Sequence, residues 1–298
     1  MGAIMILITG AAGKTGRAVI RALTRRGEAV RALVRRPEGV EALKALGADE
    51  VVAGDLLDGP AVKRAAEGAR AVYHIAPNVS PHETVIGANV IAAAQAAQVE
   101  RFVFHSVLHP QVEAMPHHWQ KMRVEELLFA SGLPFTILQP TAYMQNLLAY
   151  WQSICEQGVY AVPYPPQTRL SLVDFEDVAE AAARVLTEDG WLGATLELAG
   201  TPPLSQTEVA ETLTRRLNRP VRAEAVPLET WERSARSSGM GEYQVKALTQ
   251  MFRYYAEHGL AGNPRVLGYV LQRPPASLDE FVERILNEKR DEPVSHLH

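Results

Sequence analysis

Residues 4–16 read IMILITGAAGKTG, and this stretch decides the fold. The unbroken apolar run at 4–8 is typical of a parallel strand that is covered on both faces. Three glycines follow with the spacing G-x-x-G-x-x-G, and an amphipathic helix comes after them and stops at Gly27. Glycines here let the turn close and let backbone amides approach a pyrophosphate at the positive end of the helix. We therefore predict a dinucleotide-binding loop rather than a plain turn, formed by Gly10, Ala12, Gly13, Lys14, Thr15 and Gly16.

Strand and helix patterns alternate through the rest of the first half. Short apolar runs predict strands, and segments with helical spacing of their apolar residues predict helices between them. The predicted strands are 29–34, 50–53, 71–75, 101–105 and 135–138, and the predicted helices are 38–46, 61–67, 83–98 and 121–131. This rhythm is that of consecutive βαβ units, so we predict an α/β Rossmann domain with a doubly wound parallel sheet.

The rhythm breaks near Tyr143. Residues 151–170 contain three prolines and predict a connection over the surface. Further helices are predicted at 174–186, 205–217, 228–237, 243–258 and 277–287, and further strands at 195–198 and 221–226. Ser205, with Glu208 three residues later, has the pattern of a capping box. We predict two domains: a Rossmann domain at 1–150, and a smaller C-terminal α/β lobe at 151–298 that is interleaved with the sheet domain.

Composition argues against several classes of function. With 47% hydrophobic residues, 21% charged residues and a formal net charge of −4, the chain has the balance of a globular protein and no basic field for a nucleic-acid backbone. The single cysteine, Cys155, cannot form a disulfide within one chain and is expected to be a packed side chain. The apolar start at 3–8 is too short for a signal peptide, and no run approaches the about 20 residues of a membrane span. We expect a cytoplasmic protein.

The end of the second predicted strand favours NADP(H) over NAD(H). Arg35 and Arg36 stand where an NAD-specific site has an acidic residue that binds the adenosine ribose. Guanidinium groups match a 2′-phosphate through charge-assisted hydrogen bonds. The nearest acid, Glu38, lies beyond a proline. The alternative is a pair of solvated arginines in a loop.

The glycine spacing resembles that of the short-chain dehydrogenase/reductase superfamily, in its extended and atypical branches. The resemblance covers most of the chain, and its other motifs are AGDL at 53–56, HSV at 105–107, HHWQK at 117–121, QPTAYMQN at 139–146 and VDFEDVA at 173–179. Together these motifs resemble the NmrA-like branch of atypical members. That branch includes quinone and dye reductases, and also NADP-binding proteins without evident catalysis that act as redox-responsive regulators.

The resemblance implies further contacts to the cofactor. It places Asp55 and Leu56 at the adenine, with Asp55 accepting a hydrogen bond from the amino group, and the alternative for Asp55 is a turn residue. Ala76 and Pro77, after the fourth predicted strand, are expected to line the cofactor groove. Further cofactor-binding candidates within the motifs are Ser106, Lys121, Pro140 and Tyr143.

The catalytic motif departs from the pattern of the superfamily. Typical members carry Tyr-x-x-x-Lys, in which the lysine holds the nicotinamide ribose and lowers the pKa of a proton-donating tyrosine. Lys121 matches the lysine, but His117 stands at the tyrosine position, four residues earlier on the same helical face. His117 is a candidate general acid, or else a polar residue at a helix start. Lys121 is a candidate ribose ligand, or else a solvated lysine. The departure puts alcohol–ketone chemistry in doubt.

Two residues after the sixth predicted strand are candidates for the substrate end of the site. Tyr143 and Asn146 are expected at the mouth of the sheet, where open α/β folds bind ligands, to contact substrate or nicotinamide. For Tyr143, which is also a catalytic candidate, the alternative is a cap on the core. Asp174 and Asp177 are better explained by helix capping than by acid catalysis. The histidines between 74 and 118 lack accompanying carboxylates, so we expect no metal site.

These features predict an NADP(H)-binding oxidoreductase that reduces quinones or similar electron-poor acceptors by hydride transfer. Quinone reduction tolerates the loss of the tyrosine because water can supply the proton. The alternative, a non-catalytic NADP(H)-sensing regulator that acts through protein partners, tolerates the same loss. A sugar-nucleotide epimerase shares the glycine pattern but needs the tyrosine. The expected partner is a small-molecule electron acceptor, with no nucleic acid bound directly and no membrane, and the sequence leaves the oligomeric state open.

Overall fold

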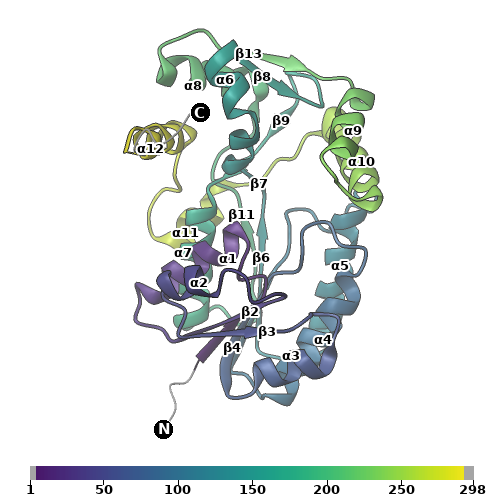
Figure 1. The fold of residues 1–298 in the computed structure, drawn as a ribbon, viewed down its shortest axis with the longest axis vertical. Coiled ribbons are helices and arrows are strands. Elements are labelled where there is room, and N and C mark those ends of the chain that lie inside the picture. Colours follow the sequence, from purple (N-terminus) through teal and green to yellow (C-terminus); the bar gives the residue numbers. More distant parts are fainter. Residues whose placement is uncertain (1–4, 292–298) are drawn as a thin grey trace.

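Seven parallel strands form the central sheet of the protein (Figure 1). The computed structural model describes residues 5–291, so Ile4 of the first predicted strand lies outside the described residues. The strands of the sheet are β1 (Met5–Ile8), β2 (Val30–Val34), β3 (Glu50–Ala53), β4 (Ala69–His74), β5 (Arg101–His105), β6 (Phe135–Pro140) and β11 (Thr195–Leu198). Their order is β11-β6-β5-β4-β1-β2-β3, and each neighbouring pair is parallel. This is the order of a doubly wound Rossmann sheet, which confirms the predicted fold class.

Helices cover both faces of the sheet (Figure 1). One face carries α1 (Lys14–Thr24), α2 (Val40–Ala45) and α7 (Phe175–Thr187), and the other carries α3 (Gly59–Ala66), α4 (Glu83–Ala96) and α5 (Pro116–Phe129). The side chains of β1 divide between the two layers: Ile6 and Ile8 pack with α1 and α7, whereas Leu7 packs on the opposite face. All three are fully buried, which is why this strand is an unbroken apolar run.

A second core lies in the smaller lobe, toward the top of Figure 1. Its elements are the 3-10 helix η1 (Met144–Tyr150), α6 (Trp151–Gln157), α8 (Gln206–Leu217), α12 (Leu278–Asp291) and the parallel pair β8 (Val159–Val162) and β13 (Arg222–Ala225). Beside them, α9 (Leu228–Ser237) packs on α10 (Glu242–His258), which in turn reaches α5. The lobe is therefore joined to the sheet domain through α10 as well as through the chain itself.

Segments from the second half of the chain return to the central sheet. Helix α7 packs against α1, β11 pairs with β6, and α11 (Pro264–Leu271) lies against both α7 and β11. Two short pairs, β7 (Ala142–Tyr143) with β10 (Leu172–Val173) and β9 (Arg169–Leu170) with β12 (Leu204–Ser205), lie where the chain passes between the lobes. The division of the chain into domains at 1–150 and 151–298 stays a prediction.

The prediction of a surface connection at 151–170 is wrong. This segment holds α6 and β8, and Trp151, Ile154, Tyr160 and Val162 are buried in the second core. Helix α6 has seven residues, too few to display a clear helical period, and the prolines begin only at Pro163, after β8 has ended. The three prolines thus mark the loop after β8 and say nothing about α6 and β8, which precede it.

The start of one helix differs by five residues from the predicted one, and another helix was not predicted. Helix α5 begins at Pro116 rather than at 121, with proline in the first turn, where its missing N–H costs nothing. Helix α11 was not predicted, although Asn263 accepts a hydrogen bond from the Arg265 amide and Pro264 follows as the first helical residue. That Asn-Pro pair was the available signal. The capping box of Ser205 is confirmed, since its side chain accepts from the amide of Glu208.

Candidate functional site

The loop between β1 and α1 is closed by glycines that leave no room for a side chain. Gly10 has a φ of +61°, and a Cβ there would lie 2.7 Å from the carbonyl oxygen of Ile75. A Cβ on Gly16 would lie 2.5 Å from the carbonyl oxygen of Gly10. The amide of Gly13 donates to that same oxygen at 3.0 Å. Gly10 and Gly16 are therefore required by the fold itself.

Gly13 differs from the other two because an added Cβ would meet a single atom, and less closely than at Gly10 or Gly16. It is the N-cap of α1 in extended conformation, and only the Gly10 carbonyl oxygen, at 3.3 Å, lies within 4 Å of an added Cβ. Within residues 5–291 no side chain caps this helix, whereas Asp174 and Ser205 cap α7 and α8. The first amides of α1 are thus left for water or a ligand. This arrangement suits an anion such as a pyrophosphate.

Two cations flank the same loop. Lys14 is exposed at the first position of α1. Arg17, which the sequence analysis did not single out, donates from Nε to the carbonyl oxygen of Ala12 at 3.0 Å. Ala12 is exposed and Thr15 is half-buried, so the predicted loop residues line the surface in front of the helix. Lys14 and Arg17 add positive charge to the field of the helix N-terminus.

The ends of β2 and β3 continue this edge of the sheet, because β2 pairs with β1 on one side and β3 on the other. Arg35 and Arg36 directly follow β2 and are exposed. Within residues 5–291 neither arginine forms an ion pair, whereas Arg31 on the same strand pairs with Glu50 at 2.6 Å. Two unpaired guanidinium groups are thus available beside the glycine loop.

Asp55 and Leu56 follow β3. The Asp55 carboxylate is exposed and accepts a hydrogen bond from the Leu57 amide at 2.9 Å, which is the turn role considered as the alternative. Leu56 packs partly into the core, and its carbonyl oxygen accepts from the side chain of Asn89 at 2.9 Å. The adenine contact of these two residues stays a prediction.

Residues after β4 are fixed to the end of β1. The Thr9 hydroxyl accepts from the Ile75 amide at 3.0 Å and lies 2.8 Å from Nδ1 of His74. Ala76 is buried and Pro77 is exposed, so the chain comes to the surface at this point. Their place beside the glycine loop follows from the pairing of β1 with β4.

Lys121 is held at the ends of β4 and β5 by a buried carboxylate. Its ammonium donates to Oε1 of Glu83 at 2.8 Å and to the carbonyl oxygen of His105 at 3.3 Å, and it lies 5.5 Å from the centroid of the Phe104 ring. The side chain of Lys121 is 16% exposed and that of Glu83 only 4%. Lys121 is therefore not the solvated lysine considered above. An ammonium has three N–H donors, so one remains for a ligand.

Three aromatic side chains form a hydrogen-bonded chain near the ends of β4 and β5 and on β7, which follows β6. Nδ1 of His105 lies 2.7 Å from the Tyr73 hydroxyl, and Nε2 lies 2.8 Å from the Tyr143 hydroxyl. Burial, with a further contribution from Lys121, lowers the pKa of His105 to about 3, so its ring is neutral at pH 7. Burial raises the pKa of the Tyr143 phenol, and the Thr15 hydroxyl acts in the opposite direction. Tyr143 is thus a neutral phenol that lies near the glycine loop.

Ser106 and Pro140 are buried in contacts with the protein. The Ser106 hydroxyl donates to Oε1 of Glu125 at 2.5 Å, and the Gln139 side chain donates to both oxygens of the same carboxylate, at 2.9 and 3.1 Å. Burial raises the pKa of Glu125, and these hydrogen bonds oppose the shift. The Pro140 carbonyl oxygen accepts from the Leu108 amide at 2.9 Å. The cofactor contacts proposed for Ser106 and Pro140 stay predictions.

His117 lies in the first turn of α5, four residues before Lys121. Its Nδ1 atom is buried and has no hydrogen-bond partner within residues 5–291, and its ring meets that of His118 at a centroid distance of 4.6 Å. Burial, followed by the charge of Lys121, lowers the pKa of His117 to about 4. The imidazolium that a general acid needs is therefore scarce at pH 7. Asn146 is exposed on η1, three residues beyond Tyr143.

The two aspartates at the start of α7 have structural roles. Asp174 caps the helix by accepting from the Glu176 amide at 3.0 Å, as predicted. Asp177 is not a cap: it accepts from the Ala276 amide and from Arg273, each at 2.7 Å, and so holds the C-terminal segment on the helix. Burial raises the thiol pKa of Cys155, which makes it a poor nucleophile. Within residues 5–291 no three potential ligands group to hold a metal.

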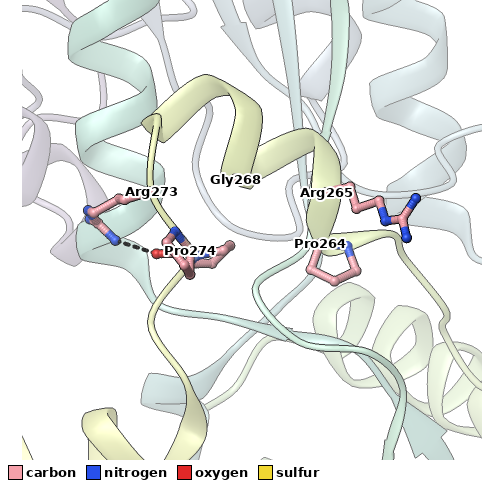
Figure 2. A pocket seen from close by; sticks show the side chains of 6 residues that line it. Pro264, Arg265, Gly268, Arg273 and Pro274 are labelled. Carbon is pink, nitrogen blue, oxygen red and sulfur yellow. Dashed lines mark hydrogen bonds between the residues drawn. The ribbon is translucent and has the colours of Figure 1, made fainter.

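A separate surface hollow of about 460 Å³ lies beside α11 (Figure 2). It is lined by Pro264, Arg265, Gly268, Arg273, Pro274 and Pro275. In Figure 2 the Arg265 side chain points away from Arg273, whose guanidinium binds the Pro274 carbonyl oxygen at 3.0 Å. No polar groups converge there, and no residue of the hollow belongs to the site at the strand ends.

Sequence reasoning missed four polar residues that support the site. Tyr73, Glu83 and Glu125 contact His105, Lys121 and Ser106 respectively, and Gln139 donates to the Glu125 carboxylate. Tyr73, which stands beside His74 near the end of the buried strand β4, was the available signal for one of them. The others become visible only once the neighbouring strands and helices are placed in space.

The fold and the site together define an atypical member of the short-chain dehydrogenase/reductase superfamily. The Rossmann sheet, the G-x-x-G-x-x-G loop and the lysine on the helix before β6 are present, and a histidine replaces the tyrosine. Within that superfamily the chain belongs to the NmrA-like family, whose model matches residues 3–290. Within residues 5–291 no helix is both long enough and apolar enough to cross a membrane.

Known relatives match the chain over nearly its whole length. It is 31% identical over 284 residues to the NAD(P)H azoreductase of Xenophilus azovorans, which covers 94% of this chain and 97% of that protein. The NADPH complex of the NADPH-dependent quinone oxidoreductase of Escherichia coli superposes with a TM-score of 0.84 at 28% identity, covering 95% of this chain and 100% of that one. The triphenylmethane reductase of Citrobacter sp., solved with NADP(H), shares the fold, with a TM-score of 0.83, 22% identity and coverage of 94% and 99%.

Proposed function

We propose that this chain is an NADP(H)-dependent oxidoreductase that transfers hydride to quinones or similar electron-poor acceptors. The observation that carries the proposal is the N-terminus of α1, which no side chain caps and which follows the tightly closed glycine loop. Lys121 binds the end of β5 through the His105 carbonyl oxygen, and Tyr143 lies on β7, where its hydroxyl meets the ring of the same histidine. The relatives named for NAD(P)H azoreductase and NADPH-dependent quinone oxidoreductase activity support this reading.

The site has polar groups for three parts of a dinucleotide: the pyrophosphate, the 2′-phosphate and the nicotinamide ribose. The amides after Gly13 would hold the pyrophosphate, and Arg35 with Arg36 would hold a 2′-phosphate. The third N–H of Lys121 would serve the nicotinamide ribose. When bound, the reduced cofactor supplies a hydride. Residues of the 151–298 lobe, which we propose as the substrate domain, would then face the acceptor.

The protonation states of the site favour an acceptor that needs no strong acid. The pKa of His117 is lowered to about 4 and that of His105 to about 3, in each case mainly by burial, so neither ring is cationic at pH 7. Burial also raises the phenol pKa of Tyr143. A quinone meets this condition because its reduced oxygen can take a proton from water. An alcohol–ketone reaction relies on an activated proton donor and is disfavoured.

We expect Arg35→Ala and Arg36→Ala to weaken NADPH binding and to leave NADH binding nearly unchanged. A hydrogen bond to a charged group contributes about 1.5–3 kcal/mol, so losing one corresponds to about ten- to a hundredfold in affinity. We expect the larger effect at Arg35, which directly follows Val34. The measurement is calorimetric titration of each variant with NADPH and NADH at low and moderate salt, since screening weakens an exposed phosphate contact.

Arg25→Ala is the matched control, because Arg25 is an exposed arginine that follows α1 at the opposite end from the glycine loop. It is expected to change neither affinity. Equal wild-type affinities for NADPH and NADH, with no change of their ratio in Arg35→Ala or Arg36→Ala, would show that these two arginines are only surface charge.

We expect the wild-type protein to oxidise NADPH with quinones and to show little or no oxidation of simple secondary alcohols with NADP. The reason is that Lys121 is retained, whereas His117, at the tyrosine position, is a neutral imidazole at pH 7 and cannot act as an activated acid. The measurement is a panel of benzoquinones and naphthoquinones with NADPH consumption followed at 340 nm, a general property of the reduced nicotinamide. Tight NADPH binding without turnover of any quinone would instead favour the NADP(H)-sensing regulator.

A further inference from the structure

The hydrogen bonds of Tyr73 constrain where the proton of Tyr143 points. Tyr73 lies inside β4 and is fully buried. Within residues 5–291 its hydroxyl has one hydrogen-bond partner, Nδ1 of His105 at 2.7 Å. Tyr143 occupies the other nitrogen of that ring at 2.8 Å, and the two rings lie nearly parallel, at 18°. One neutral imidazole thus connects a buried phenol to a phenol at the edge of the sheet.

A neutral imidazole carries one N–H, so only two arrangements of protons are open. If Nδ1 carried it, Nδ1 would donate to Tyr73, and the buried Tyr73 proton would have no acceptor. If Nε2 carries it, Tyr73 donates to Nδ1, and Nε2 donates to the oxygen of Tyr143. The second arrangement satisfies every polar hydrogen of the buried pair, and leaving a buried donor unpaired is costly. It also leaves the proton of Tyr143 directed away from His105.

We propose that Tyr73 and His105 are positioning residues that turn the Tyr143 proton toward the bound acceptor, where Tyr143 donates a hydrogen bond to the oxygen on which charge develops. This inference rests on the proposed oxidoreductase function. The Tyr143 hydroxyl lies 2.8 Å from Nε2 of His105, whose carbonyl oxygen accepts from Lys121 at 3.3 Å, so it lies beside the residue that we propose for the nicotinamide ribose. The neutral state of His105, which follows from its burial, agrees with a single ring proton.

The step balances without a new reactant. A carbon–hydrogen bond of the reduced cofactor breaks, and its hydrogen and two electrons pass to the quinone, which is reduced while the cofactor is oxidised. The quinone oxygen gains negative charge, accepts the Tyr143 hydrogen bond and takes its proton from water. Tyr143 keeps its own proton. If it gave that proton up and regained one from His105, His105 would take the proton of Tyr73 and leave a phenolate there, and burial raises the pKa of Tyr73 well above the usual value. Tyr143 thus replaces the missing motif tyrosine as a donor, from a different strand end.

The proton arrangement can be measured without any activity. Nitrogen-15 NMR of histidine-labelled protein distinguishes an Nε2–H ring from an Nδ1–H ring, and the spectrum of His105→Asn identifies the His105 signals. We expect the Nε2–H form in the wild type, and a populated Nδ1–H form in Tyr73→Phe, where the constraint is removed. A wild-type ring in the Nδ1–H form would overturn the proposal.

Kinetics test the donor role with two acceptors that differ in their need for it. A quinone develops charge on oxygen, whereas a triphenylmethane dye cation accepts hydride on carbon and forms no oxyanion. We expect Tyr143→Phe to lower kcat for the quinone about ten- to a hundredfold more than for the dye, the loss of about one hydrogen bond to a charged group. Tyr73→Phe should shift the same ratio in the same direction by a smaller factor. A merely structural role would slow both acceptors alike, and that result would overturn the proposal.

The two proposals fail in different ways. If the wild type reduces neither acceptor, the proposed function is contradicted, and the NMR measurement still decides the orientation of the Tyr143 proton. If the wild type reduces both acceptors and the quinone-to-dye ratio is unchanged in Tyr143→Phe, the function stands and the donor role of Tyr143 is overturned.

Discussion

Gly13→Val is expected to leave the protein folded and to abolish NADPH binding. The backbone at Gly13 is extended, with a φ of −72°, which valine adopts without strain. Its Cβ would meet only the Gly10 carbonyl oxygen, at 3.3 Å, a tight contact that a small shift relieves, and the methyl groups would add bulk at the uncapped N-terminus of α1. Losing two charge-assisted hydrogen bonds to the pyrophosphate corresponds to about 3–6 kcal/mol, or more than about a hundredfold in affinity. Calorimetric titration with NADPH is the measurement.

Two neighbouring variants separate a blocked site from a damaged fold. Gly13→Ala adds only the Cβ and should weaken binding less than valine does. Gly16→Ala should lower thermal stability, because its Cβ would lie 2.5 Å from the Gly10 carbonyl oxygen, and Gly13→Val should cost at most about 1 kcal/mol as a poorer N-cap. A folded Gly13→Val protein with wild-type NADPH affinity would remove the glycine loop from the cofactor site.

Lys121→Met is expected to destabilise the protein by about 3–5 kcal/mol, the usual cost of leaving one partner of a buried ion pair alone. Methionine keeps the aliphatic stem beside Phe104, so packing is largely preserved. The Glu83 side chain, 4% exposed, would then lose the ammonium that lies 2.8 Å from it. The measurement is urea unfolding of the protein without cofactor at pH 7.

A double-mutant cycle isolates the pair itself. Glu83→Gln should cost less than Lys121→Met, because Lys121 keeps the His105 carbonyl oxygen and is more exposed than its partner. Lys121→Met combined with Glu83→Gln should be more stable than the sum of the single effects implies, since the orphaned charge is gone. Additive effects within about 0.5 kcal/mol would mean that the two charges do not interact, and the contact would have no energetic role.

The sheet domain was predictable because most of its strands are apolar runs buried on both faces, although β3 and β11 are only partly buried. Runs such as Met5–Ile8 and Arg101–His105 are short and bounded by loops, and α1, with 11 residues, is long enough to show a helical period, whereas α2 has only six. The smaller lobe gave weaker signals. Its strands have two to four residues, and β13 alternates charged and small side chains that are mostly exposed. Such segments acquire their structure from tertiary packing, which a local pattern does not record.

Those parts of the candidate site whose residues are close together in the sequence were predictable. The glycine loop and the Arg35–Arg36 pair each lie within a few residues, and the sequence places them at strand ends. The partners of Lys121 and His105 lie 38 and 32 residues away, on α4 and β4. The neutral state of His117 likewise depends on burial by elements remote in sequence. Contacts of this kind follow from the order of strands in the sheet, which the sequence indicated only in outline.

The return of the chain to the sheet also has a consequence for protein synthesis. The nucleotide-binding half is not complete when its first six strands have left the ribosome, because α7 and β11 come from Phe175–Thr187 and Thr195–Leu198. Until then β6 is an edge strand with unpaired backbone groups, and such an edge can pair with other nascent chains. The apolar face of α1 that α7 covers is exposed over the same interval. Translation must therefore pass residue 198 of 298 before the cofactor-binding half can reach its native, aggregation-resistant form.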